Sequence, residues 1–189
     1  DDVVDDAAIR RGRPAAHSLW GNQVVVLVGD FLYANALRAS VFQKSQLIME
    51  HLSTATTRMT EGELLQLSKT ADPDITENDY LSIIAGKTGS LISASCSIGA
   101  ILGGATGPQV EALAEFGLKT GMVFQMVDDI LDYAAEQQAF GKKLGKDLEE
   151  GKITLPLILL MQEAGPDEKT LLRELITAET HEPGGDLRT

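Results

Sequence analysis

Apolar residues recur at three- and four-residue steps along most of this chain, and no segment alternates apolar and polar residues as a strand does. This spacing gathers apolar side chains on one face of a helix. We therefore predict an all-α fold formed by a single domain over residues 1–189. The expected helices lie at about 19–42, 45–68, 77–102 and 108–136, with shorter ones beginning near Pro156 and Pro166. The expected connections are 9–14, 71–75, 103–107 and the polar segment 137–152.

The expected helix at 77–102 has an unusual composition. It begins with a capping-box pattern, Thr76 followed three residues later by Asp79. Its middle is rich in glycine, alanine and serine, which lets a neighbouring helix or a ligand come close. Lys87 and Thr88 lie within this stretch. Lys87 can extend to solvent, as long lysine side chains do, or it can pair with a bound anion.

Composition narrows the class of protein. The 189 residues carry a net charge of -12, which argues against general nucleic-acid binding, since that requires a basic surface. Hydrophobic residues make up 43% of the chain, as in folded globular proteins. The single cysteine, Cys96, excludes an internal disulfide and favours a cytoplasmic setting. The longest aliphatic run, Val24–Val28, is too short to cross a bilayer, so no transmembrane segment is expected.

Two segments repeat the pattern Asp-Asp-x-x-Asp: Asp1, Asp2 and Asp5, and later Asp128, Asp129 and Asp132. On a helix, the first and last aspartate of each motif share a face. Carboxylates that close repel one another unless a cation neutralises them, and hard oxygen ligands of this kind suit Mg²⁺. The alternative is a solvated acidic face. It is weaker for the second motif, where the acids and the preceding Gln125 lie among apolar residues and an unpaired buried charge is costly.

A basic segment follows each acidic motif. Arg10 and Arg11 follow the first, and a glycine-containing loop with Lys142, Lys143, Lys146 and Lys152 follows the second. Guanidinium groups bind phosphate in a bidentate manner. Either cluster alone is compatible with ordinary surface charge. The repeated order of acids and then bases favours a clamp for a diphosphate that leaves as an anion.

Five motifs, in order over residues 1 to about 160, resemble those of the trans-isoprenyl diphosphate synthases, or polyprenyl synthetases. The resemblance is greatest to medium- and long-chain members such as octaprenyl and heptaprenyl diphosphate synthases. The segments that carry it are the two aspartate-rich motifs at 1–5 (with 10–12) and 124–132, Gly29–Leu32, Lys87–Gly89, and the glycine- and lysine-containing segment 141–156.

The resemblance implies an all-α helical bundle of the isoprenoid synthase type around a central cavity, assembled as a homodimer, with several Mg²⁺ ions at the cavity mouth. It implies metal ligands at Asp1, Asp2, Asp5, Asp128 and Asp132, and catalytic roles for Asp1, Asp2, Asp5, Lys87, Asp128 and Asp129. It also implies substrate contacts. Isopentenyl diphosphate would be bound by Arg11, and the allylic diphosphate by Arg10, Lys87, Thr88, Gln125, Lys142 and Lys152.

The implied activity is a Mg²⁺-dependent prenyl transfer. Isopentenyl diphosphate condenses with an allylic diphosphate, such as farnesyl diphosphate, to build all-trans polyprenyl diphosphates and release diphosphate. Transient membrane contact is expected only for long products. The family's basic segment before the first motif and the residues ahead of Asp1, which influence product length, are not part of the printed sequence. We expect that the chain lacks an N-terminal part of the family's domain and that its C-terminal helices are shortened.

Four other functions stay open at this point. A shorter-chain farnesyl or geranylgeranyl synthase would share the same motifs. A class I terpene cyclase would usually carry an Asn/Ser/Glu motif in place of Asp128–Asp132. A non-catalytic subunit of a heteromeric synthase tends to lose its acidic motifs. A helical scaffolding protein would leave the placement of the arginines and lysines unexplained.

Overall fold

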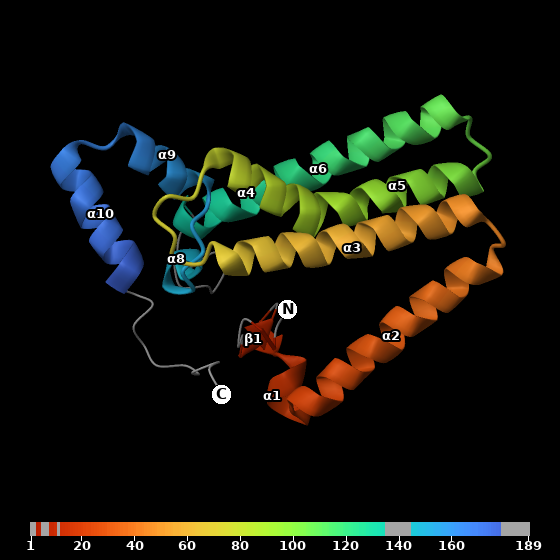
Figure 1. Cartoon of the computed structure of the whole chain (residues 1–189). Helices are drawn as coiled ribbons and strands as arrows, with labels where there is room; N and C mark the ends of the chain where they lie inside the picture. Colours follow the sequence, from red (N-terminus) through yellow and green to blue (C-terminus); the bar gives the residue numbers. More distant parts are fainter. Residues whose placement is uncertain (1–2, 5–7, 11, 135–144, 179–189) are drawn as a thin grey trace. The chain divides into compact units, whose positions relative to one another are not determined.

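The structure is a computed structural model, and it describes residues 3–4, 8–10, 12–134 and 145–178. Apart from one hairpin of two-residue strands, its regular elements are helices, which confirms the all-α prediction (Figure 1). The elements are β1 (Ile9–Arg10), β2 (Arg13–Pro14), α1 (Ala16–Trp20), α2 (Asn22–Phe42), α3 (Gln46–Ser68), α4 (Glu77–Ile84), the π-helix η1 (Ala85–Gly89), α5 (Ser90–Leu102), α6 (Gly107–Ala134), α8 (Lys146–Glu149), α9 (Leu155–Glu163) and α10 (Pro166–Ala178).

A hairpin of two short strands and one short helix occupy segments that the sequence predicts as connections. β1 and β2 pair antiparallel, with Ile9 opposite Pro14, and Gly12 supplies the positive φ of 74° that the turn needs. The four-residue helix α8 lies within the expected loop 137–152. Contacts divide the chain into two compact units, residues 1–53 and 54–189, which are described separately, and the single domain stays a prediction.

In the first unit, α2 begins three residues later than predicted because Gly21, with φ of 78°, separates it from α1. The hydroxyl of Ser40 donates a hydrogen bond to the sulfur of Met49 at 3.0 Å, which joins the end of α2 to the first turn of α3. Most large apolar side chains of α2, including Leu27 and Phe31, are exposed within the described residues.

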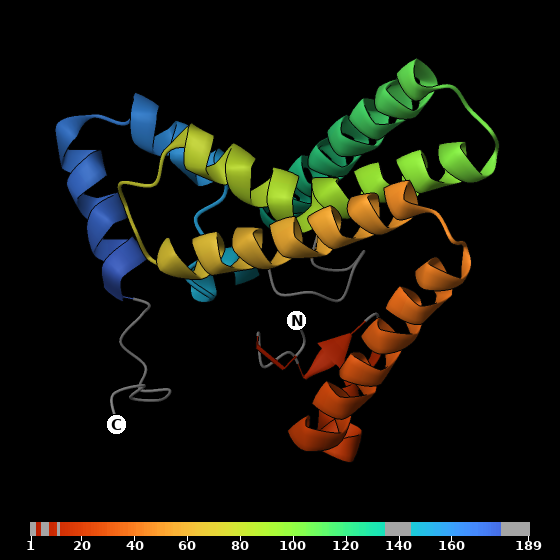
Figure 2. The same ribbon diagram turned by 45° about the vertical axis from the view of Figure 1, so that its right-hand side comes forward.

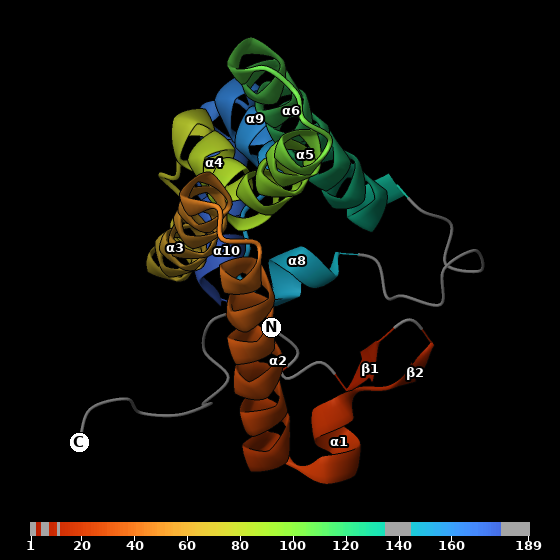
Figure 3. The same ribbon diagram turned by 90° about the vertical axis from the view of Figure 1, so that its right-hand side faces the viewer.

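In the second unit, the predicted capping box starts α4. The backbone N–H of Asp79 donates to the Thr76 hydroxyl at 3.1 Å, and the backbone N–H of Thr76 donates to the Asp79 carboxylate at 3.0 Å. From this cap the chain continues without a break through α4, η1 and α5. Figure 3 shows α4 and α5 beside α3 and α6.

Glycines let these helices touch backbone to backbone. A methyl group placed on Gly62 of α3 would lie 2.7 Å from the backbone nitrogen of Lys87. One placed on Gly121 of α6 would lie 2.7 Å from the Cα of Gly89. The small-residue stretch thus allows a close approach on two sides, as its composition predicts.

Buried apolar residues of α4, α9, α10 and the loops beside them form one cluster. Figure 2 shows α9 and α10 (blue) near the α4 end of the second unit. Pro156 and Pro166 lie in the first turns of α9 and α10, as predicted. The buried members of the cluster are Ile75, Tyr80, Ile83, Ile84, Ile153, Leu157, Ile158 and Ile176.

Two stretches, Asn22–Phe42 and Glu77–Leu102, are long and apolar enough to cross a membrane when length and composition alone are judged. In the described structure, 0% of the first apolar window and 33% of the second is buried. Core helices of water-soluble proteins and signal sequences meet the same criterion. The absence of a transmembrane segment therefore stays a prediction.

Candidate active site

The second acidic motif occupies the last described turns of α6. Asp128 is exposed and Asp132 is partly buried, whereas only 5% of Asp129 is exposed. Because a helix turns about 100° per residue, Asp128 and Asp132 share a face and Asp129 points to another side. The motif thus separates one inward-facing carboxylate from two that lie nearer to solvent.

The carboxylate of Asp129 is held by two donors. The Tyr80 hydroxyl donates to its Oδ2 at 2.7 Å, and the Gln125 side-chain amide donates to its Oδ1 at 2.8 Å. Burial raises the pKa of Asp129, the two hydrogen bonds oppose that rise, and the charges of Asp128 and Asp132 add to it. Burial also raises the pKa of Tyr80, as does the hydrogen bond to Asp129, so the phenol keeps its proton and acts as the donor.

The network continues to Thr88. Its hydroxyl donates to Oε1 of Gln125 at 3.0 Å, so both ends of the Gln125 amide are engaged. Lys87 and Thr88 lie in η1, and single π-helical turns inside α-helices occur frequently at functional sites. The structure therefore brings together Thr88, Gln125 and Asp129, three of the residues predicted for the site.

Lys87 faces α3. Its ammonium group lies 2.8 Å from Oε2 of Glu63 and donates to Oε1 of Gln66 at 2.8 Å. The Lys87 and Glu63 side chains are 26% and 25% exposed, so the pair is partly shielded from water. The predicted diphosphate contact thus has a protein anion and an amide as its partners in this structure.

The segment after residue 144 holds Asp132 through the backbone. The Gly145 N–H donates to the Asp132 carbonyl at 3.0 Å, and the Asp147 N–H donates to its Oδ2 at 3.1 Å. Burial raises the pKa of Asp147 to about 7, and the charges of Asp132 and Asp129 add to the rise. Three carboxylates therefore lie close enough to influence one another.

Lys152, another predicted substrate contact, pairs with Glu150 at 2.7 Å, and Lys146 pairs with the same carboxylate at 2.6 Å. Burial raises the pKa of Glu150, but hydrogen bonds from the two lysines outweigh it and the pKa is lowered. Both lysine side chains are thus oriented by one partly buried carboxylate, that of Glu150 at the end of α8.

The residues that would hold Mg²⁺ fit a hard cation in part. The Asp128 side chain makes no hydrogen bond or ion pair with other described residues, and the Asp132 side chain, one turn away, accepts from the Asp147 N–H. Exposed carboxylates with room for water suit Mg²⁺, which keeps several waters when bound by protein. Within the described ranges, no group of three histidine, cysteine or acidic side chains forms a complete metal site.

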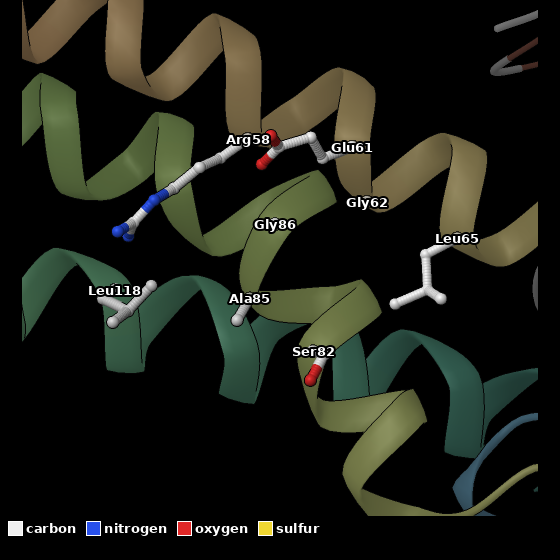
Figure 4. Close-up of a pocket in the computed structure, with 8 residues that line it drawn as sticks. All are labelled: Arg58, Glu61, Gly62, Leu65, Ser82, Ala85, Gly86 and Leu118. Carbon is white, nitrogen blue, oxygen red and sulfur yellow. The ribbon is translucent and has the colours of Figure 1, made fainter.

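A separate pocket of about 310 Å³ lies between α3, α4, η1 and α6 (Figure 4). In Figure 4, Arg58 and Glu61 project from α3, and Leu118 comes from α6. The pocket is lined by Arg58, Glu61, Gly62, Leu65, Ser82, Ala85, Gly86 and Leu118. None of these is a predicted site residue, so the pocket adds nothing to the acidic site.

With this geometry in place, comparison with known proteins is decisive. The family model described as Polyprenyl synthetase matches residues 1–186. The chain belongs to the polyprenyl synthetase family.

Individual proteins that are similar to this chain are also polyprenyl synthases. A curated all-trans-nonaprenyl-diphosphate synthase (geranyl-diphosphate specific) from Rhodobacter capsulatus is 45% identical, over 93% of this chain and 54% of its own length. The crystal structure of a decaprenyl diphosphate synthase from the same organism matches with a TM-score of 0.89 at 40% identity, over 97% of this chain and 57% of that one. That of a polyprenyl synthase from Caulobacter crescentus CB15, complexed with calcium and isoprenyl diphosphate, matches with a TM-score of 0.83 at 39% identity, over 95% and 60%.

The chain therefore spans about half the length of the curated polyprenyl synthases it matches. Several predicted site residues lie outside the described part of this polyprenyl synthetase chain: Asp1, Asp2, Asp5, Arg11 and Lys142. Arg10 is described, and it lies exposed in β1 of the first unit.

Sequence reasoning missed the partners that hold the predicted residues in this polyprenyl synthetase site. They are Glu63, Gln66, Tyr80, Asp147 and Glu150. Asp147 stands within the last motif of the family resemblance, which was a usable signal. Tyr80 is separated from Asp129 by 49 residues, and nothing local distinguishes it from an apolar core residue.

Proposed function

We propose that this chain is the part of a Mg²⁺-dependent prenyltransferase that carries both of its acidic motifs. The enzyme would condense isopentenyl diphosphate with an allylic diphosphate to build all-trans polyprenyl diphosphates. The observation that carries the proposal is the arrangement on α6, where Asp128 and Asp132 share a face while Asp129 is anchored inward at 2.7 Å from Tyr80. This arrangement offers two carboxylates to one cation site.

The substrate-binding roles follow from charge and position. Lys87 is oriented by Glu63 and would exchange this partner for the allylic diphosphate. Lys152, Arg10 and Lys142 would add cations to that diphosphate, and Arg11 would bind isopentenyl diphosphate. Mg²⁺, held by Asp128 and Asp132 together with Asp1, Asp2 and Asp5, would supply further positive charge on the departing group.

The proposed condensation needs no reagent other than its two diphosphate substrates. The allylic carbon–oxygen bond breaks, and its electron pair leaves on diphosphate, whose charge the fixed cations stabilise. The double bond of isopentenyl diphosphate attacks the allylic cation and forms the new carbon–carbon bond. A proton is then lost to the released diphosphate. Thr88 and Gln125, which are hydrogen-bonded to each other at 3.0 Å, would help to stabilise the positive charge through their dipoles.

The test uses the full-length protein with Mg²⁺, labelled isopentenyl diphosphate and farnesyl diphosphate, and sizes the extracted products. We expect longer prenyl chains that disappear when a chelator is added. Asp128→Asn should remove most turnover, whereas Asp167→Asn, a matched change at an exposed site on α10, should not. Products formed without isopentenyl incorporation would indicate a cyclase. No incorporation with any allylic primer would indicate a non-catalytic subunit.

The product's chain length, the preferred primer, the oligomeric state and the cellular location are part of the same proposal. The relatives' names favour a long-chain product, and those names already differ between nonaprenyl and decaprenyl. The sized products from farnesyl and geranyl diphosphate would give both the chain length and the preferred primer. A homodimer and a cytoplasmic location are likewise proposed.

A further inference from the structure

Tyr80 is the residue that most directly fixes the second acidic motif, although it belongs to no motif of the sequence. It lies in the first turns of α4, 2% exposed, and its ring is part of the apolar cluster shared with α9 and α10. Its hydroxyl is a polar group at the edge of an otherwise apolar cluster. It reaches Oδ2 of Asp129 at 2.7 Å across 49 residues of sequence.

Asp129 is held on both sides. One oxygen accepts from Tyr80, and the other accepts from Gln125, whose carbonyl in turn accepts from Thr88. With both oxygens engaged and 5% of the residue exposed, the side chain has a single orientation, toward the interior. A carboxylate in this position serves as an anchor between helices.

The anchor helps to fix the rotation of α6 about its own axis, together with the backbone contact at Gly121. At about 100° per residue, Asp128 lies about 100° and Asp132 about 60° to the same side of Asp129. Fixing Asp129 toward α4 therefore aims both neighbours at one region. The backbone N–H of Asp147 restrains Asp132 independently at 3.1 Å. No described donor restrains Asp128, so its direction depends on the anchor.

We propose that Tyr80 is a positioning residue for the metal-binding carboxylates of the second acidic motif, and that it acts through Asp129, which is an anchor and not a metal ligand. This inference rests on the proposed function, because it concerns the same acidic site. Residues that orient metal ligands from behind typically change metal affinity by about 10–100-fold when they are altered.

The test measures Mn²⁺ binding by electron paramagnetic resonance in the full-length protein with inorganic diphosphate present, alongside the Mg²⁺ concentration that gives half-maximal prenyl transfer. Tyr80→Phe keeps the ring and removes the hydroxyl. We expect it to weaken Mn²⁺ binding and raise the Mg²⁺ requirement about 10-fold or more, with kcat at saturating Mg²⁺ largely kept. Tyr33→Phe makes the same change at a tyrosine that is 51% exposed, and it should change neither value.

A double-mutant cycle separates positioning from simple packing. If Tyr80 acts through Asp129, then Tyr80→Phe combined with Asp129→Asn should bind Mn²⁺ no more weakly than the worse single variant. Additive losses, or wild-type Mn²⁺ affinity in Tyr80→Phe, would overturn the proposal. If Tyr80→Phe does not fold, Asp129→Asn is compared with Asp128→Asn, since it leaves the ring in place. A loss of Mn²⁺ binding that is smaller than in Asp128→Asn supports the anchor, whereas unchanged binding, or a loss as large as in Asp128→Asn, refutes it. Absence of prenyl transfer in the wild type would refute the proposed function, while the Mn²⁺ titration would still test the anchor.

Discussion

The ammonium group of Lys87 lies 2.8 Å from the carboxylate of Glu63, within a pair of side chains that are only 26% and 25% exposed. The contact joins η1 to α3 at the point where Gly62 and Gly86 allow the two backbones to meet. The lysine predicted to bind diphosphate is therefore oriented by a carboxylate of the neighbouring helix.

Lys87→Met should raise the apparent KM for the allylic diphosphate. A hydrogen bond to a charged group contributes about 1.5–3 kcal/mol, which corresponds to a rise of roughly 10–100-fold. Steady-state kinetics of the full-length protein would measure it. Lys119→Met is the matched control, because the Lys119 side chain is 71% exposed and its ion pair among the described residues is with its helix neighbour Glu115, at 2.7 Å. Equal KM values in the two variants would contradict the role given to Lys87.

Gly121→Ala should destabilise the second unit. The added methyl group would lie 2.7 Å from the Cα of Gly89, so η1 and α6 must move apart. Overpacking of this kind costs about 1–3 kcal/mol. Gly99→Ala, where nothing lies within 4 Å of the new methyl group, should instead gain about 0.5–1 kcal/mol from helix propensity. Urea denaturation would compare them, and a loss of the same size in both would refute the steric explanation.

Helix positions could be predicted because their signals are local. The capping box at Thr76 and the prolines at 156 and 166 mark helix starts that the structure reproduces. The elements that sequence reasoning missed depend on contacts made elsewhere. Helix α8 begins where Gly145 and Asp147 donate their backbone N–H groups to Asp132, and this contact exists only after α6 and the loop have folded together.

The same distinction applies to the site. The shared face of Asp128 and Asp132 follows from a spacing of four residues, so the sequence was sufficient. The burial of Asp129 could not be read in this way, because its partner Tyr80 lies 49 residues away on another helix. Acidic spacing predicts which carboxylates share a face, but only packing determines which of them is turned inward.

Asp147→Asn should flatten the pH dependence of stability. Burial and the charges of Asp132 and Asp129 raise the pKa of Asp147 from 3.8 to about 7. Since the folded state holds this proton more tightly, Asp147 stabilises it fully below pH 3.8, and that contribution is lost as the pH rises through about 7. The free energy of unfolding of the variant should therefore fall less than that of the wild type across this range.

Urea denaturation at several pH values, with a chelator present, would measure the difference. Asp167→Asn provides the comparison, because Asp167 is exposed at the start of α10. Its curve should run parallel to that of the wild type. A parallel curve for Asp147→Asn as well would show that Asp147 titrates normally in the folded protein.

Mg²⁺ and inorganic diphosphate, added together, should raise the melting temperature of the full-length protein. Ligands that bind only the folded state stabilise it by about 2.7 kcal/mol at 100 times their Kd. Asp128→Asn should lose most of this shift, because Asp128 is an exposed carboxylate with no described partner to compete for the cation. Asp167→Asn should keep it, since that residue lies on α10, away from the acidic motif in sequence. Scanning calorimetry with and without the additions would decide. A full shift in Asp128→Asn would mean that the second acidic motif does not bind the metal–diphosphate pair.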